Sequence, residues 1–257
     1  TTDDDTRLQL ITTDAGLGDV RDVIGVIAGD LEADGDLDLV VSTEQDGIRL
    51  FANRGNRSFF EISDALKGFA ADDPAQAMAI ADLDRDLDLD VVTVHPKSGR
   101  VGLIENLLHL QFRGTYFDQF APTERVDTLF IEDVDGNVSW DLILGGESKT
   151  MIVYSQTADA GAWTVEDVVE VDHAGSGSAL ADFDNDSWMD MLAPSGSTTD
   201  RTRIGPWGFS PWQGLSPIAP VRDVSVADFD RDGAVDVVGI DDSGVQVMLN
   251  QTRGMGH

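Results

Sequence analysis

The sequence predicts an all-β protein made of five similar units, each with four antiparallel strands. Three observations carry this prediction. An acidic stretch recurs about every 50 residues, short apolar runs bounded by Gly, Asn, Asp and Ser surround each copy, and helical periodicity is absent over any useful length. Five such units account for the 257 residues, so we expect a single domain.

Each unit presents the same elements in the same order. An apolar stretch comes first, with small residues alternating in several copies, as in MAIA (78–81). The acidic loop and a second apolar run follow, then a third apolar stretch such as IRLF (48–51) and a fourth such as SFFEI (58–62). The five acidic copies with their flanks are GDLEADGDLDLVV (29–41), ADLDRDLDLDVVTV (81–94), EDVDGNVSWDLIL (132–144), ADFDNDSWMDML (181–192) and ADFDRDGAVDVVGI (227–240).

Four short strands in a repeat of this length are typical of one blade of a β-propeller. We therefore predict a five-bladed β-propeller with the small-residue strand innermost. The fifth unit lacks a fourth strand, and residues 7–12 are predicted to dock as the outer strand of that last blade and close the ring. An open fragment of a six- or seven-bladed ring is the alternative. The predicted blades span residues 18–66, 67–119, 120–170, 171–218 and 219–253.

Composition excludes several classes of function. The net charge of −31 disfavours nucleic acid and anionic membrane surfaces as partners. No apolar run approaches the length of a membrane span, and the first ten residues, TTDDDTRLQL, show no signal-peptide pattern. Cysteine is absent, which excludes disulfides, thiolate metal sites and cysteine nucleophiles.

The acidic loops fit the pattern D-x-D-x-D-G-x-x-D. Side chains at positions 1, 3, 5 and 9, with the backbone carbonyl of position 7, could supply the six to eight oxygens that Ca²⁺ prefers; Mg²⁺ demands a stricter geometry. An EF-hand is excluded, because position 12 is never Glu and the flanks resemble strands. The candidate metal ligands are Asp30, Glu32, Asp34, Asp36 and Asp38; Asp82, Asp84, Asp86, Asp88 and Asp90; Asp133, Asp135, Asn137, Ser139 and Asp141; Asp182, Asp184, Asp186, Trp188 and Asp190; and Asp228, Asp230, Asp232, Ala234 and Asp236.

The five loops differ in how well they keep the pattern. A tight turn at position 6 requires a positive φ, which glycine adopts freely, and the first and fifth loops have Gly35 and Gly233 there. The fourth loop has Ser187, the second has Leu87 and the third has Val138, whose side chains disfavour that conformation. We expect the best Ca²⁺ sites in the first and fifth loops. A simpler interpretation, solvated turns in which Asp caps local amides, does not explain five copies in one register.

The pattern, the preceding small-residue strand and the period together resemble the FG-GAP/VCBS repeats of integrin-α-like propellers. The resemblance implies Ca²⁺ in blade loops at one face of the disc. It also implies adhesion or ligand recognition at an extracellular, periplasmic or cell-surface location. LFANRGNRSF (50–59) and the final LNQTRGMGH resemble the cartilage-acidic-protein/UnbV branch, in which a further C-terminal domain follows the propeller.

Two classes of function remain open at this level. One is a non-catalytic recognition module with a protein or carbohydrate ligand of unknown identity. Its candidate ligand patch is Trp207, Phe209 and Trp212, although packing of these side chains between blades is the favoured interpretation. The other is a glycoside hydrolase or polysaccharide lyase acting at the channel mouth, which would need two unlike carboxylates across a cleft. The sequence selects no such pair, and His173 is the one tempting base.

Overall fold

The computed structural model describes the larger part of the chain and almost all of its regular structure is β-strand. The described residues are 10–70, 72–117, 126–134, 138–146, 150–156, 163–170, 178–194, 199–205, 208–211, 221 and 223–251. Among them, one 3₁₀ turn, η1 (Ser63–Ala65), is the only helical element. No helix in this part of the chain is long and apolar enough to cross a membrane.

The strands form five sheets. The first consists of β1 (Val23–Gly29), β2 (Asp38–Thr43), β3 (Gly47–Asn53) and β4 (Phe59–Glu61). The second consists of β6 (Ala77–Ala81), β7 (Asp90–His95), β8 (Arg100–Asn106) and β9 (Phe112–Phe117), with the two-residue β5 (Leu66–Lys67) parallel to β9. The third consists of β10 (Val126–Glu132), β11 (Asp141–Gly146), β12 (Thr150–Gln156) and β13 (Trp163–Glu170). The fourth consists of β14 (Ala179–Ala181), β15 (Asp190–Pro194), β16 (Thr199–Gly205) and β17 (Gly208–Pro211), and the fifth of β18 (Asp223–Ala227), β19 (Asp236–Asp241) and β20 (Gly244–Met248).

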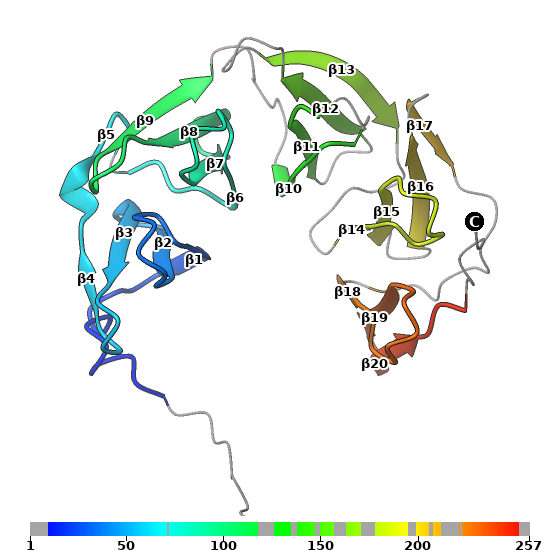
Figure 1. Cartoon of the computed structure of the whole chain (residues 1–257), viewed down its shortest axis with the longest axis horizontal. Coiled ribbons are helices and arrows are strands. Elements are labelled where there is room, and N and C mark those ends of the chain that lie inside the picture. The colour runs from blue at the N-terminus through cyan, green and yellow to red at the C-terminus, as the bar shows by residue number, and fades with distance from the viewer. Residues whose placement is uncertain are drawn as a thin grey trace, which may run out of the picture.

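The sheets stand side by side in an arc (Figure 1). The first strand of each sheet (β1, β6, β10, β14 and β18) lies on the inside of the arc, and successive strands pair antiparallel outward from it. The small residues of these first strands allow the close approach, because a side chain at Gly29 would sit 2.3 Å from Ile80 of the next sheet. The predicted all-β, antiparallel, propeller-like architecture is confirmed at this level.

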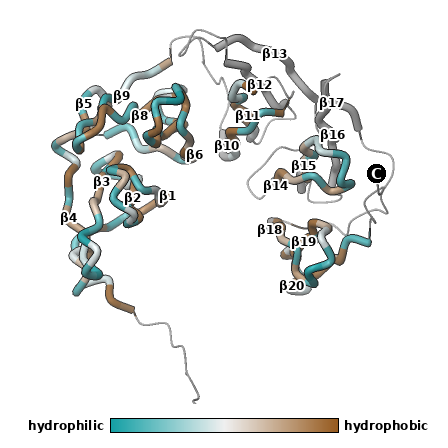
Figure 2. The backbone as a smooth tube through the Cα atoms, in the orientation of Figure 1, coloured by the Kyte–Doolittle hydropathy of each residue, from teal (hydrophilic) through white to brown (hydrophobic). Residues whose placement is uncertain are grey.

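The hydrophobic core is divided into layers between neighbouring sheets. Leu50 and Ile104 belong to the layer between the first and second sheets, and Val92 and Leu142 to the layer between the second and third. Ala181, Phe183, Leu192 and Val237 form a layer between the fourth and fifth sheets. Hydrophobic strand segments accordingly alternate with hydrophilic loop segments along the described chain (Figure 2). Every residue of β7, the second strand of the second sheet, is buried, because this sheet has a neighbouring sheet on each side.

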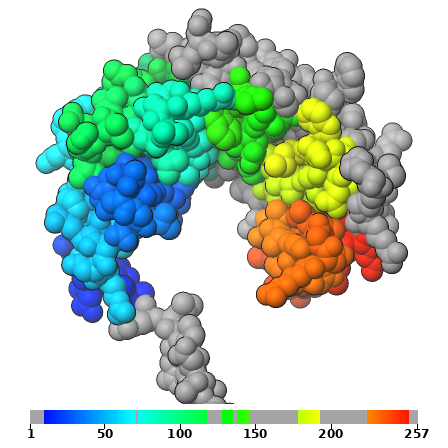
Figure 3. Space-filling model, in the orientation of Figure 1, coloured from blue at the N-terminus to red at the C-terminus, as the bar shows by residue number. Residues whose placement is uncertain are grey.

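The arc is open between the first and fifth sheets (Figures 1 and 3). The described part of the predicted closing strand, residues 10–12, forms no strand, and the fifth sheet has three strands among the described residues. Closure of the ring is therefore not observed. Both ends of the arc expose large apolar side chains: Val23, Ile24 and Val26 on β1, and Phe229, Ile240, Val245 and Val247 on the fifth sheet.

Candidate metal centres

Each acidic loop connects the first and second strands of its sheet and is held in one register. The aspartate at position 9 opens the second strand and pairs with the residue just before position 1, as Asp38 does with Gly29 and Asp236 with Ala227. The same pairing occurs in the other three sheets. The strand register therefore brings the two ends of all five loops together.

The position 1 and position 9 carboxylates organise the loop backbone. Asp30 Oδ2 accepts the N–H of Gly35 at 2.9 Å, and Asp228 Oδ2 accepts that of Gly233 at 3.0 Å. The equivalent bond from position 6 to position 1 is present in the other loops. At position 9, one carboxylate oxygen accepts the N–H of position 2 in all five loops. The position 9 side chains are fully buried, with at most 2% exposed, so they are structural groups whether or not a cation is bound.

The turn at position 6 has the same backbone conformation in all five loops. Gly35 and Gly233 have φ of 92° and 89°, and Leu87, Val138 and Ser187 have 78°, 71° and 76°. The predicted reluctance of the branched residues does not prevent the turn. Hydrogen bonds from the position 6 N–H to position 1 hold them in the left-handed region, where an L-residue is strained.

Leu87→Gly is expected to stabilise the protein. Leu87 is 88% exposed, so it loses little packing, whereas relief of its left-handed strain is worth about 1–2 kcal/mol. The greater freedom of glycine in the unfolded chain offsets roughly 0.4–1 kcal/mol of this. We expect a melting temperature higher by about 1–3 °C, measured by thermal unfolding in chelator. Leu37→Gly, at an exposed loop position without positive φ, is the control and should destabilise; an unchanged or lower melting temperature for Leu87→Gly would contradict the strain.

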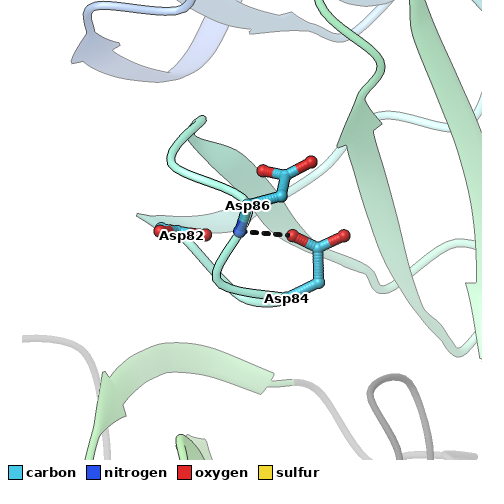
Figure 4. Close-up of side chains that lie close together, drawn as sticks. All are labelled: Asp82, Asp84 and Asp86. Atoms are coloured by element: carbon cyan, nitrogen blue, oxygen red, sulfur yellow. Dashed lines mark hydrogen bonds between the residues drawn. The ribbon is translucent and has the colours of Figure 1, made fainter.

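Within the described residues, three loops bring three carboxylate oxygens within 4.8 Å of one another. These groups are Asp82, Asp84 and Asp86; Asp182, Asp184 and Asp190; and Asp228, Asp230 and Asp236. Figure 4 shows the first group, in which the N–H of Asp86 donates to Asp84 Oδ1 at 3.3 Å. The first loop, with the longer Glu32 at position 3, is not among these groups although all its residues are described. Asp135 and Asn137 of the third loop lie outside the described residues.

Among the described residues, two loops contain buried carboxylate oxygens without a hydrogen-bond donor. Asp190 is fully buried, and its Oδ1 accepts no hydrogen bond in this part of the chain. In the second loop, Asp82 Oδ1 and both oxygens of the buried Asp88 are in the same situation. An unpaired buried carboxylate is strongly unfavourable. A cation would supply the missing partner, and an all-oxygen donor set of this kind fits Ca²⁺.

Burial is the main cause of the raised pKa values among these acids. Burial raises the pKa of Asp190 to about 7 and that of Asp90 to about 6. Burial, followed by contact with Asp86, raises the pKa of Asp88 to about 7. The pKa of Asp236 is lowered instead, chiefly by the N–H of Asn250. Asp88, Asp90 and Asp190 thus bind a proton more readily than an exposed aspartate does.

Asparagines at the ends of third strands are functional candidates that the sequence reasoning missed. The backbone N–H groups of Asn53, Asn106 and Asn250 donate to the position 9 aspartates of their own sheets at 2.8, 2.9 and 2.7 Å. The repeated signal was visible as an apolar strand ending in Asn, in LFAN, LIEN and VMLN. The sequence patterns did not single out Trp140 either. Its Nε1–H donates to the Asp82 carbonyl of the preceding sheet at 2.7 Å.

The remaining sequence candidates are only partly placed. Trp207, Trp212 and His173 lie outside the described residues, and the backbone of Phe209 is in β17. His95 is fully buried, between Thr93 Oγ1 at 2.8 Å and the Asp73 carbonyl at 2.9 Å.

A cavity of about 310 Å³ lies on the inside of the arc. The residues that line it include Val26, Gln76, Met78, Thr128 and Phe130.

Comparison with known proteins supports the repeat and the fold. A family model described as an FG-GAP-like repeat matches residues 30–93, and no curated protein matches the chain. The structure of an Agrocybe aegerita lectin, which specifically recognises non-reducing terminal N-acetylglucosamine, has a TM-score of 0.65 at 19% identity, covering 90% of this chain and 64% of the lectin chain. The structure of BBS1N in complex with ARL6DN has a TM-score of 0.56 at 12% identity, covering 91% of this chain and 65% of that one.

These structural neighbours bear on the fold alone, because their sequence identity is low. The chain spans slightly less than two thirds of the length of both neighbours. The match at residues 30–93 covers the first two acidic loops, from Asp30 to Asp90. The predicted FG-GAP resemblance is thereby confirmed, and residues 30–93 are FG-GAP-like repeat sequence within a propeller-like all-β chain.

Proposed function

We propose that this protein is a calcium-binding, non-catalytic recognition module of the adhesion type. The observation that carries the calcium proposal is Asp190. Its buried Oδ1 lacks a donor, and the residue offers an oxygen within 4.8 Å of oxygens from Asp182 and Asp184. In each loop, side chains at positions 1, 3, 5 and 9 and the carbonyl of position 7 would hold the ion. The ion would neutralise the acids and fix the loop.

Calorimetric titration of the chelator-stripped chain with Ca²⁺ tests this proposal. We expect saturable binding of several ions, with Asp182→Ala removing one of them, because position 1 would be a direct ligand. Asp64→Asn, an exposed acid outside the loops, is the control for loss of negative charge and should leave the number of ions unchanged. A site at 100-fold excess of Ca²⁺ over Kd adds about 2.7 kcal/mol of stability. Absence of both binding and thermal stabilisation in Ca²⁺ would refute the proposal.

A glycoside hydrolase or polysaccharide lyase is the alternative function. Such an enzyme needs two carboxylates facing one cleft, one of them with a raised pKa. None of the described residues lining the cavity inside the arc is acidic, and the acids with pKa raised to about 6 or 7 in this part of the chain lie in the loops. These observations favour recognition over catalysis.

The ligand we propose is a carbohydrate or a protein. We propose that the protein binds it at an extracellular, periplasmic or cell-surface location. Support comes from the FG-GAP-like repeat and from the lectin among the structural neighbours. Binding of the protein to an array of glycans, measured with and without Ca²⁺, would test whether the ligand is a carbohydrate. Binding that disappears on chelation would support it, and no binding to any glycan would leave a protein as the proposed ligand.

We also retain the prediction that the chain forms one five-bladed ring. The apolar side chains exposed at the two ends of the arc support closure, because burying them against each other removes that surface from water. The chain has no cysteine, so spin labels can be placed at Val23→Cys and Val247→Cys alone. A short, narrow distance distribution between these labels is expected for a closed ring. A long distance would favour the open fragment of a six- or seven-bladed ring.

A further inference from the structure

Two of the third-strand asparagines connect one sheet to the sheet before it. The side chain of Asn106, at the end of β8, donates from Nδ2 to the Leu31 carbonyl in the acidic loop of the first sheet, at 2.7 Å. The side chain of Asn250, just after β20, donates to the Phe183 carbonyl in the loop of the fourth sheet, also at 2.7 Å. Both accepting carbonyls belong to position 2 of their loops. The same contact thus recurs at two separate interfaces between sheets.

Each of these asparagines also contacts its own loop, which produces a continuous chain of hydrogen bonds. Asp90 Oδ1 accepts the Asn106 N–H at 2.9 Å, Asn106 Nδ2 donates to Leu31, and the Leu31 N–H donates to Asp38 Oδ2 at 2.9 Å. The chain therefore runs from position 9 of the second loop to position 9 of the first. All four residues are at most 3% exposed, so water does not compete for these bonds.

The fourth and fifth sheets repeat this chain with different residues. Asp236 Oδ1 accepts the Asn250 N–H at 2.7 Å, Asn250 Nδ2 donates to Phe183, and the Phe183 N–H donates to Asp190 Oδ2 at 3.0 Å. All three asparagines donate from Nδ2 to the position 8 carbonyl of their own loop, at 3.0 Å for Asn53, 3.5 Å for Asn106 and 3.1 Å for Asn250. The bond to the preceding sheet is added for Asn106 and Asn250, whereas the first sheet, which contains Asn53, has no sheet before it in the arc.

We infer that Asn106 and Asn250 join neighbouring acidic loops into coupled pairs, so that an ion bound in one loop of a pair strengthens binding in the other. This inference rests on the proposed calcium binding. The physical reason is that the position 9 aspartates lie at both ends of the chain of bonds. An ion that fixes Asp38 also fixes the Leu31 backbone, which holds Asn106 in place to donate to Asp90. Buried hydrogen bonds polarise one another, and the coupling must act equally in both directions.

Asn106→Ala removes the bridge while leaving the Asn106 backbone bond to Asp90 available. The first readout needs no calcium: amide hydrogen exchange at Leu31, measured by NMR in chelator. We expect exchange at Leu31 to become at least tenfold faster, although the substitution lies in the next sheet, because the Leu31 carbonyl loses its buried donor. Asn56→Ala, in the exposed turn between β3 and β4, is the asparagine-to-alanine control and should leave this rate unchanged.

The second readout measures coupling between the loops. The amide of Gly35, which donates to Asp30, reports Ca²⁺ binding in the first loop. Disabling the second loop with Asp82→Ala is expected to weaken Ca²⁺ binding at the first loop by about fivefold or more, the range of ordinary coupling free energies. In the Asn106→Ala background this effect of Asp82→Ala should disappear. Asn250→Ala provides the same test for the fourth and fifth loops, with Gly233 as reporter.

The possible failures are distinguishable. Unchanged exchange at Leu31, or an Asp82→Ala effect that persists in Asn106→Ala while Gly35 still responds to Ca²⁺, would overturn the inference and leave the proposed function intact. A Gly35 amide that responds to Ca²⁺ in no variant, with the Gly233 amide equally silent and no binding in the calorimetric titration, would overturn the proposed calcium binding and the coupling together.

Discussion

Asp90→Ala is expected to lower the free energy of unfolding by about 3 kcal/mol even in the absence of calcium. Its carboxylate accepts the backbone N–H groups of Leu83 and Asn106, at 3.2 and 2.9 Å, and both donors are buried. A buried donor left without an acceptor costs about 1–3 kcal/mol. Relief from burying the charged carboxylate, whose pKa is raised to about 6, offsets part of the loss. Chemical denaturation at pH 7 in chelator measures the difference.

Asp84→Ala in the same loop is the matched control. Asp84 is exposed and accepts one N–H, from Asp86, and burial followed by the Asp86 charge raises its pKa. In chelator its removal should change stability little, because repulsion is relieved as one bond is lost. In Ca²⁺, both variants should lose stabilisation relative to the parent chain. Equal stability losses for both variants in chelator would contradict the structural role assigned to position 9.

Acidification below pH 6.5 is expected to destabilise the second sheet through His95. The ring of His95 is fully buried, with Nδ1 at 2.9 Å from the Asp73 carbonyl and 3.6 Å from its carboxylate. Burial lowers the pKa of His95 below its usual 6.5 despite these acceptors. The neutral ring therefore contributes its full stability above pH 6.5, and this contribution is lost as the pH falls through the folded pKa. The loss amounts to about 1.4 kcal/mol for each unit by which the pKa is lowered.

The buried aspartates act in the opposite direction over the same pH range. Asp90 and Asp190, with pKa values raised to about 6 and about 7, favour the folded chain at low pH and lose that contribution as the pH rises. The His95 effect is therefore isolated as the difference between the parent chain and His95→Gln, measured in chelator from pH 7.5 to 5. Gln can contact Thr93 and Asp73 but has no charge to gain. A difference in unfolding free energy that stays constant over this range would contradict the prediction.

The repeating part of the fold could be predicted from the sequence because it depends on local patterns, namely the spacing of the acidic loops and the apolar runs beside them. The loops at Asp30 and Asp228 lie between two antiparallel strands, as their spacing and apolar flanks predict. Alternation of strands and turns says nothing about the angle between successive sheets, however. Closure of the ring depends on that angle, which is why residues 7–12 could not be assigned by alignment alone.

The arrangement of the carboxylates within the candidate loops could not be predicted from the sequence. The sequence favours the first loop because of Gly35, yet three carboxylate oxygens approach most closely where Asp84, Asp184 or Asp230 stands at position 3. The length of a side chain and the packing of neighbouring sheets decide this arrangement, and neither follows from a nine-residue pattern. Leu87 shows the same limit, since its backbone hydrogen bond to Asp82 outweighs an unfavourable local preference.

The division of the apolar interior into separate layers has a consequence for how damage spreads. A residue such as Leu50 contacts the layer it shares with the second sheet, and Leu192 belongs to another layer between the fourth and fifth. Stability in such an array is close to a sum of nearest-neighbour terms. A destabilising substitution should therefore unfold the nearest pair of sheets first. The sheets at the other end of the arc can stay folded for as long as the apolar layer between them is intact.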